Sequence, residues 1–230
     1  MGGAVIRPRP FFFVRRMDYI GGMTPASGPF RCDVAIAGGG PVGLTLALGL
    51  ARRGFDVVVA DAAPPADKAR PDTRAYFISH GCWRIFRALG IEDQLLPDAE
   101  PVTQVEAEGR VGGISFIAEE CSEPALGYMI NAAVLNAALT RAVGAEKSVK
   151  LLSGVRITQT AFGGAGAVLT LGDTHIEAPL VVGCDGRNSL VRRAANIRFE
   201  GHDYDAAAIS TTVRLGRPHN GVARQIFLPN

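Results

Sequence analysis

The amino-acid sequence predicts an α/β fold: a Rossmann-like βαβ core with a parallel sheet, plus part of a smaller antiparallel β domain. Apolar runs at residues 32–37 and 56–60 have the length and composition of buried strands. Residues 41–53 between them show helical periodicity and are followed by Gly54, a typical helix end. Two buried strands joined by one helix make a βαβ unit with parallel strands. Short alternating segments between residues 101 and 130 predict an antiparallel excursion from that sheet.

The other elements follow from local signals along the chain. Residues 62–72 are rich in proline and predict a loop, and Ser79 is expected to cap a helix that runs to about Leu89 and ends at Gly90. A hairpin turn is expected at Gly172-Asp173. Further helices are expected at 132–143 and 189–195, and further strands at 102–106, 114–117, 149–152, 155–160, 167–171, 175–178, 180–184 and 206–215.

Length and charge limit the domain count and the class of partner. The chain has 230 residues, which at about 150 residues per domain corresponds to one large domain or one and a half. Its 24 Lys and Arg residues against 22 Asp and Glu residues leave a net charge of +2, so nucleic acid is not expected as the main partner. A hydrophobic fraction of 47% is sufficient for a real core.

Cysteine spacing and hydropathy argue against metal sites and membrane spans. The four cysteines contain no CxxC pair and no zinc-ligand spacing, so we expect no metal and free thiols, although the sequence alone leaves a disulfide open. The uncharged run from Val34 to Ala51 is split by Gly38-Gly39-Gly40-Pro41, which fits a βα unit better than a membrane helix. Prolines interrupt the apolar N-terminus, which is therefore a poor secretory signal; a transit peptide stays open.

A glycine-rich loop follows the first predicted strand. Gly38, Gly40 and Gly43 form G-x-G-x-x-G, which opens a predicted helix, and the next strand ends at Asp61. This is the context of a dinucleotide-binding fingerprint: Gly38 permits the turn, Gly40 lets the backbone approach a pyrophosphate, Gly43 allows close helix packing, and Asp61 accepts from a ribose. The alternative is a tight βα turn that needs glycine for packing alone.

A second motif, D-G-x-x-S-x-x-R, is matched by Asp185, Gly186, Ser189 and Arg192 after the last predicted buried strand. With this motif the chain resembles the FAD-dependent aromatic hydroxylases, the class A flavoprotein monooxygenases. Asp72-Thr73-Arg74-Ala75 is similar to a third segment of that class. Within the class the chain is most similar to the ubiquinone-biosynthesis hydroxylases, over nearly all of residues 33–230, including 74–89, 126–139, 183–193 and 217–229.

The resemblance implies roles for individual residues, all of them in cofactor binding. Arg74 would contact the flavin cofactor, and Asp185 with Gly186 would meet its ribityl-pyrophosphate region. Asn131 is a candidate that either caps a helix or approaches the flavin. Asp61 stands where the family more often has Glu. No side chain is assigned as catalytic, because the flavin carries the chemistry and the protein positions it.

The resemblance also implies an activity and a domain plan. The activity is hydroxylation of an aromatic ring by FAD, NAD(P)H and O2, with a polyprenyl phenol of ubiquinone biosynthesis as substrate. We expect a poorly ordered tail over 1–30, an FAD-binding domain over 31–200 with the β excursion at 101–130, and the start of a substrate-binding β-sheet domain over 201–230. A third family motif is expected beyond Asn230, so that this portion alone would bind FAD weakly and turn over little.

Two alternative functions stay open, and the interpretation also predicts a cellular location. The chain could instead be a flavin hydroxylase or halogenase of small aromatics, or a catalytically silent truncated FAD-binding fragment. A substrate panel would separate the first, and NAD(P)H consumption with O2 the second. We expect a cytoplasmic location, or a peripheral one at the inner membrane in a membrane-associated ubiquinone-biosynthesis assembly, because such substrates are lipidic.

Overall fold

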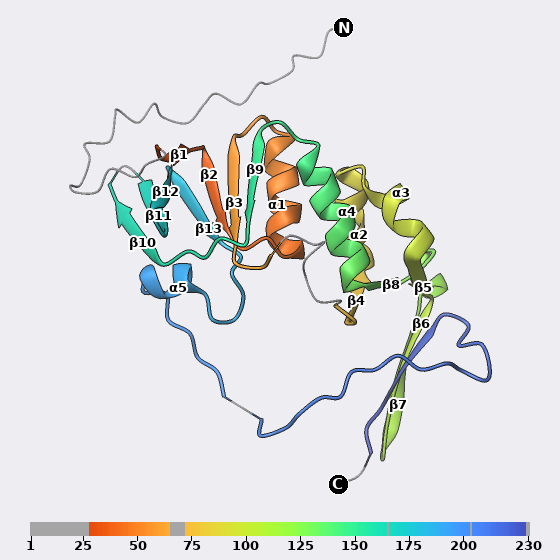
Figure 1. The fold of residues 1–230 in the computed structure, drawn as a ribbon. Coiled ribbons are helices and arrows are strands. Elements are labelled where there is room, and N and C mark those ends of the chain that lie inside the picture. The colour runs from red at the N-terminus through yellow and green to blue at the C-terminus, as the bar shows by residue number, and fades with distance from the viewer. Residues whose placement is uncertain (1–27, 65–71, 165, 203, 229–230) are drawn as a thin grey trace, which may run out of the picture.

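A parallel sheet of four strands lies at the centre of the structure, in the order β13-β2-β3-β9 (Figure 1). The computed structural model describes residues 28–64, 72–164, 166–202 and 204–228. The central strand β2 is buried along its whole length, because helices cover one face of the sheet and a second sheet covers the other. The four strands are β2 (Val34–Ala37), β3 (Val57–Asp61), β9 (Val149–Ser153) and β13 (Leu180–Gly183).

Two helices, α1 (Pro41–Ala51) and α4 (Ala132–Gly144), pack on one face of this sheet (Figure 1). Helix α1 buries Leu44, Ala47, Leu48 and Ala51, the three-to-four residue spacing of an amphipathic helix. The larger of two core clusters lies here and extends to Trp83, which is fully buried and stacks on Tyr128 with 4.1 Å between ring centroids. The shorter helices are α2 (His80–Ala88), α3 (Glu92–Leu95) and α5 (Leu190–Ala194), with 3-10 turns η2 (Leu96–Asp98) and η3 (Glu119–Cys121).

A second sheet, antiparallel except for the parallel pair of β1 with β12, covers the opposite face of the parallel sheet, with the order β1-β12-β11-β10. Alternate residues of its strands point inward, so that Leu169, Leu171 and Ile176 pack against Ala35 and Val58 of the parallel sheet. Its strands are β1 (Phe30–Arg31), β10 (Gln159–Gly163), β11 (Gly166–Leu171) and β12 (Thr174–Ala178).

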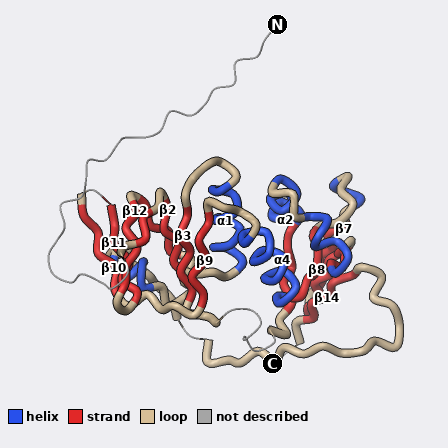
Figure 2. Tube along the Cα trace, turned by 45° about the horizontal axis from the view of Figure 1, so that its top comes forward, coloured by secondary structure: helices blue, strands red, loops and turns tan. Residues whose placement is uncertain are grey.

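Two three-stranded sheets lie beyond α4 (Figures 1 and 2). In the first, β8 pairs antiparallel with β4 and β5; in the second, β6 pairs antiparallel with β7 and parallel with β14. A long loop after α5 leads across the molecule to β14, as Figure 2 shows in tan. The strands are β4 (Ala75–Ser79), β5 (Ala99–Val102), β6 (Gln104–Gly109), β7 (Gly112–Ile117), β8 (Gly127–Asn131) and β14 (Val222–Ile226).

The predicted fold class is confirmed, and so are most of the predicted elements. The β2-α1-β3 unit is parallel, the turn at Gly172-Asp173 joins β11 to β12, and Ser79 caps α2 through its hydroxyl. The predicted tail over 1–30 lies outside the described residues except for 28–30. No helix within the described ranges has the length and apolar character needed to cross a membrane.

Two predicted strands are wrong. Of the strand predicted at 155–160, residues 155–158 form a crossing from β9 to β10, and the strand begins only at Gln159. The strand predicted at 206–215 is irregular, with Ile209 94% and Val213 66% exposed. Its alternating apolar residues have strand propensity, but they pair with no neighbouring strand among the described residues, and propensity without a partner does not form a strand.

Candidate functional site

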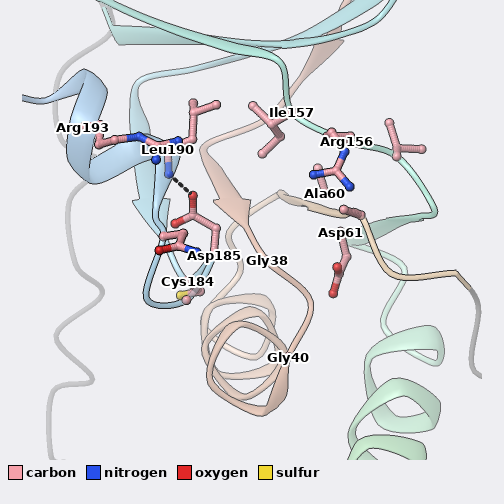
Figure 3. Close-up of a pocket in the computed structure, with 14 residues that line it drawn as sticks. Gly38, Gly40, Ala60, Asp61, Arg156, Ile157, Cys184, Asp185, Leu190 and Arg193 are labelled. Carbon is pink, nitrogen blue, oxygen red and sulfur yellow. Dashed lines mark hydrogen bonds between the residues drawn. The ribbon is translucent and has the colours of Figure 1, made fainter. Parts of the chain in front are cut away.

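A pocket of about 470 Å³ opens beyond the carboxyl ends of β2, β3, β9 and β13 (Figure 3). Open α/β sheets bind ligands at this edge, because the loops that follow parallel strands converge there. The sequence predicted five residues of its lining: Gly38, Gly40, Asp61, Asp185 and Gly186. The remaining lining residues are Ala60, Ala62, Val155, Arg156, Ile157, Cys184, Asn188, Leu190 and Arg193.

The glycine turn between β2 and α1 has a different requirement at each glycine. Gly38 has a φ of +104°, and a methyl group there would overlap the carbonyl oxygen of Cys184. A methyl group at Gly43 would overlap the carbonyl oxygen of Gly38, which fixes how closely α1 approaches the turn. At Gly40, however, a methyl group would meet no described protein atom within 4 Å. Packing alone therefore accounts for Gly38 and Gly43 but not for Gly40, which faces the open pocket.

Asp61 at the end of β3 hydrogen-bonds to the glycine turn. Its Oδ2 accepts from the backbone N–H of Gly39 at 2.7 Å, and its Oδ1 accepts from the backbone N–H of Ala63 at 2.8 Å. A methyl group at Gly39 would lie 2.7 Å from Oδ2. Gly39, to which the motif assigns no role, is thus required by its contact with Asp61.

Asp185 hydrogen-bonds to the start of α5. Its Oδ1 accepts from the Ser189 hydroxyl at 2.5 Å, and its Oδ2 accepts from the backbone N–H of Leu190 at 2.6 Å (Figure 3). Ser189 in turn caps α5 by accepting from the Arg192 N–H at 3.0 Å. Gly186, with a φ of +78°, allows the chain to turn between these residues. The D-G-x-x-S-x-x-R spacing therefore describes a hydrogen-bonded loop and helix cap.

Cys184 lies between the glycine turn and this loop, in the pocket lining. Burial raises the pKa of its thiol above the usual value, and the adjacent Asp185 raises it further. The thiol is therefore neutral at physiological pH and adds no charge to the pocket.

Two predicted site residues, Arg74 and Asn131, lie together but outside the pocket lining. The Arg74 carbonyl accepts from the Ala132 N–H at 2.8 Å, while Asn131 caps α4 through its side-chain oxygen. The Arg74 guanidinium forms a bidentate ion pair with Asp72, at 2.9 and 2.7 Å, and this holds the pKa of Asp72 below its usual value. The structure thus confirms helix capping by Asn131 and gives Arg74 a carboxylate partner.

Sequence reasoning missed two cations that line the pocket. Arg156 follows β9, and Arg193 lies on α5; Figure 3 shows them on opposite sides of the pocket. Neither belongs to a glycine or Asp-Gly motif. A position just beyond the carboxyl end of a parallel strand was the available signal for Arg156, because that edge forms the site.

The parallel sheet, the glycine turn and the pocket at the strand ends define a dinucleotide-binding protein of the Rossmann type. The chain belongs to the FAD binding domain family, whose model matches residues 31–226. It is 35% identical over 202 residues to ubiquinone hydroxylase UbiL of Rhodospirillum rubrum, covering 86% of this chain and 47% of that protein. It is 33% identical over 204 residues to 3-demethoxyubiquinol 3-hydroxylase of Escherichia coli, covering 86% and 52%.

The fold is also similar to a solved structure, that of PqsL, a probable FAD-dependent monooxygenase from Pseudomonas aeruginosa. The TM-score is 0.63 at 26% identity, over 76% of this chain and 48% of that one. The chain spans about half the length of these two curated relatives. Family membership, which the sequence resemblance implied, is confirmed, and it supports FAD as the cofactor.

Proposed function

We propose that the chain forms the FAD-binding part of a flavin-dependent monooxygenase that hydroxylates a polyprenyl phenol of ubiquinone biosynthesis, with NAD(P)H and O2 as co-substrates. The observation that carries the proposal is the pocket itself, in which the glycine turn and the Asp185 loop lie side by side at the carboxyl edge of the sheet. The similarity to two ubiquinone hydroxylases supports the substrate class.

The pocket residues fit FAD on two grounds. The open space in front of Gly40 leaves room for a phosphate, and helix α1 begins there without a side-chain cap, so its first N–H groups are free to donate to one. Asp61 and Asp185 would meet the sugar portions of the cofactor, since each carboxylate oxygen has a second lone pair beside its bond to the protein.

The division of labour between cofactor and protein follows from these contacts. FAD, when bound and reduced, supplies the chemistry that activates O2. The chain's own residues bind and orient it: the glycine turn and α1 hold the diphosphate, and the Asp185 loop fixes the adjoining sugar chain. Arg74 and Asn131 would flank the flavin portion from their position between β4 and α4.

Flavin binding tests the cofactor assignment. We expect the purified chain to bind FAD weakly, seen as a saturable change in flavin fluorescence on titration. Gly49→Ala, near the C-terminal end of α1, is a matched control for Gly43→Ala, since its methyl group would meet only the Leu89 side chain at 3.7 Å, an ordinary contact distance. Absence of FAD binding in the wild type and in Gly49→Ala alike would contradict the proposal.

A substrate panel tests the reaction. A polyprenyl phenol is expected to perturb the flavin absorbance, whereas NAD(P)H oxidation with O2, with a product heavier by one oxygen atom, is expected to be slow in this portion alone. Preference for small aromatic acids would instead indicate the alternative class of flavin hydroxylases. Flavin binding with neither substrate response nor NAD(P)H oxidation would indicate the catalytically silent alternative. Association with a membrane-bound assembly is part of the proposal because the substrate is lipidic, and co-sedimentation with vesicles that contain the polyprenyl phenol measures it.

A further inference from the structure

We propose that Arg156 and Arg193 are the side chains that recognise the phosphates of the dinucleotide in this pocket. The two pocket carboxylates, Asp61 and Asp185, also hold the pocket loops in place, in addition to meeting the sugar portions of the cofactor. The inference rests on the FAD-binding function proposed above, and it assigns charge recognition to two residues outside the motif positions.

The first step concerns the carboxylates, whose oxygens are directed at the protein. Both Asp61 oxygens accept backbone N–H groups, one from the glycine turn and one from the loop after β3. Both Asp185 oxygens are also engaged, one with the Ser189 hydroxyl and the other with the Leu190 N–H. Loss of either carboxylate would therefore free a loop of the pocket, whatever its contact with a ligand.

The second step concerns helix α5, which is not available as a phosphate site. Its first N–H groups already have acceptors: those of Leu190 and Val191 donate to Asp185, and that of Arg192 donates to Ser189. Helix α5 can therefore contribute to phosphate recognition on this side of the pocket only through a side chain. Arg193 is the cation that α5 contributes to the pocket lining.

The third step concerns the partners of the two arginines. Within the described ranges, no carboxylate lies in ion-pair or hydrogen-bond contact with Arg156 or Arg193. Arg74, by contrast, donates from two guanidinium nitrogens to the two carboxylate oxygens of Asp72. The two Asp and two Arg side chains of the pocket sum to zero charge. The orientation of these groups therefore decides which ligand charge the pocket attracts. The carboxylates are neutralised in part by the backbone N–H groups that they accept, whereas the guanidinium groups lie on opposite sides of the open space (Figure 3) and can bind an anion.

The experiment compares FAD binding by the wild-type chain with that of Arg156→Gln, Arg193→Gln and the double variant, at several salt concentrations. Arg110→Gln is the matched control, because Arg110 is exposed in the turn between β6 and β7 and lies outside the pocket lining. Riboflavin is the ligand control, since it lacks the phosphates. The fluorescence of Trp83, the single tryptophan, reports whether each variant is folded.

We expect each single variant to weaken FAD binding about tenfold, as for one charged hydrogen bond, and the double variant to weaken it further. The salt dependence of FAD binding should decrease in each, while riboflavin binding stays unchanged. Arg156→Lys and Arg193→Lys should retain the salt dependence. FAD affinity equal to that of Arg110→Gln in both Gln variants would overturn the inference alone, whereas absence of FAD binding by the wild type would overturn the proposed function with it.

Discussion

Replacing Asp185 by Asn separates a positioning role from a ligand contact. The carboxylate accepts hydrogen bonds from the Ser189 hydroxyl at 2.5 Å and from the Leu190 and Val191 N–H groups at 2.6 and 3.4 Å. Asparagine keeps one acceptor oxygen and turns its amide toward a donor. One lost bond to a charged acceptor is worth about 1.5–3 kcal/mol, and a helix cap about 1 kcal/mol. Because Asp185 is half-buried, we expect Asp185→Asn to lower the free energy of unfolding by about 2–3 kcal/mol.

Urea unfolding followed by Trp83 fluorescence measures this loss, since Trp83 is the single tryptophan and is fully buried in the core beside the parallel sheet. Asp173→Asn is the matched control, because Asp173 is exposed in the β11–β12 turn. In a double-mutant cycle, Asp185→Asn and Ser189→Ala should lose less together than the sum of the single losses, because they share a bond. Equal unfolding midpoints for Asp185→Asn and Asp173→Asn would refute the positioning role, and a selective loss of FAD binding would then indicate direct contact.

Further predictions concern packing and the thiols. Gly43→Ala should destabilise the chain and abolish FAD binding, since its methyl group would overlap the glycine turn; Gly49→Ala should be neutral or stabilising by about 0.5–1 kcal/mol. Burial raises the pKa of Cys32 to about 11, so its thiol should react with maleimide at pH 8 far more slowly than exposed Cys82. Because an unfolded thiol ionises near pH 8.5, this burial contributes stability below that pH that is lost as pH rises toward 11, and an alkaline unfolding series measures it. Bound FAD should further protect Cys184; labelling unchanged by FAD would place the cofactor elsewhere.

Local patterns were sufficient for the parts of the fold that form from neighbouring residues. The β2-α1-β3 unit, the Ser79 cap and the Gly172 turn each depend on a few consecutive residues, and each is where the sequence indicates. Strand β4 was missed, and β8 was expected only as part of the excursion at 101–130, because the two strands pair across about fifty residues and β4 alternates between half-buried and exposed positions. Residues 206–215 show the converse, since they have a strand pattern but no strand partner in the described structure.

The residues of the candidate site likewise divide into those that local motifs predict and those that depend on the tertiary structure. The motifs identified the glycine turn, Asp61 and the Asp185 loop because these residues follow strands whose ends meet at one edge of the sheet. They did not show which way the carboxylates point, because Gly39 and Leu190 donate to them only once the turns have formed. Arg156 carries no periodic or motif signal, so its place in the pocket depends on how β9 aligns beside β3.

The ion pair between Arg74 and Asp72 bears on the predicted flavin contact, and its strength decides how. The Arg74 side chain is 65% exposed, and exposed ion pairs contribute about 0–1 kcal/mol because water and salt screen them. A hydrogen bond from a guanidinium to a phosphate or flavin carbonyl is worth about 1.5–3 kcal/mol, so the cofactor would outcompete Asp72 for Arg74 if it came within reach. The ion pair with Asp72 therefore weakens a contact between Arg74 and the flavin cofactor only slightly. Asp72 then keeps the guanidinium near the Tyr76 ring of β4 until a ligand replaces it.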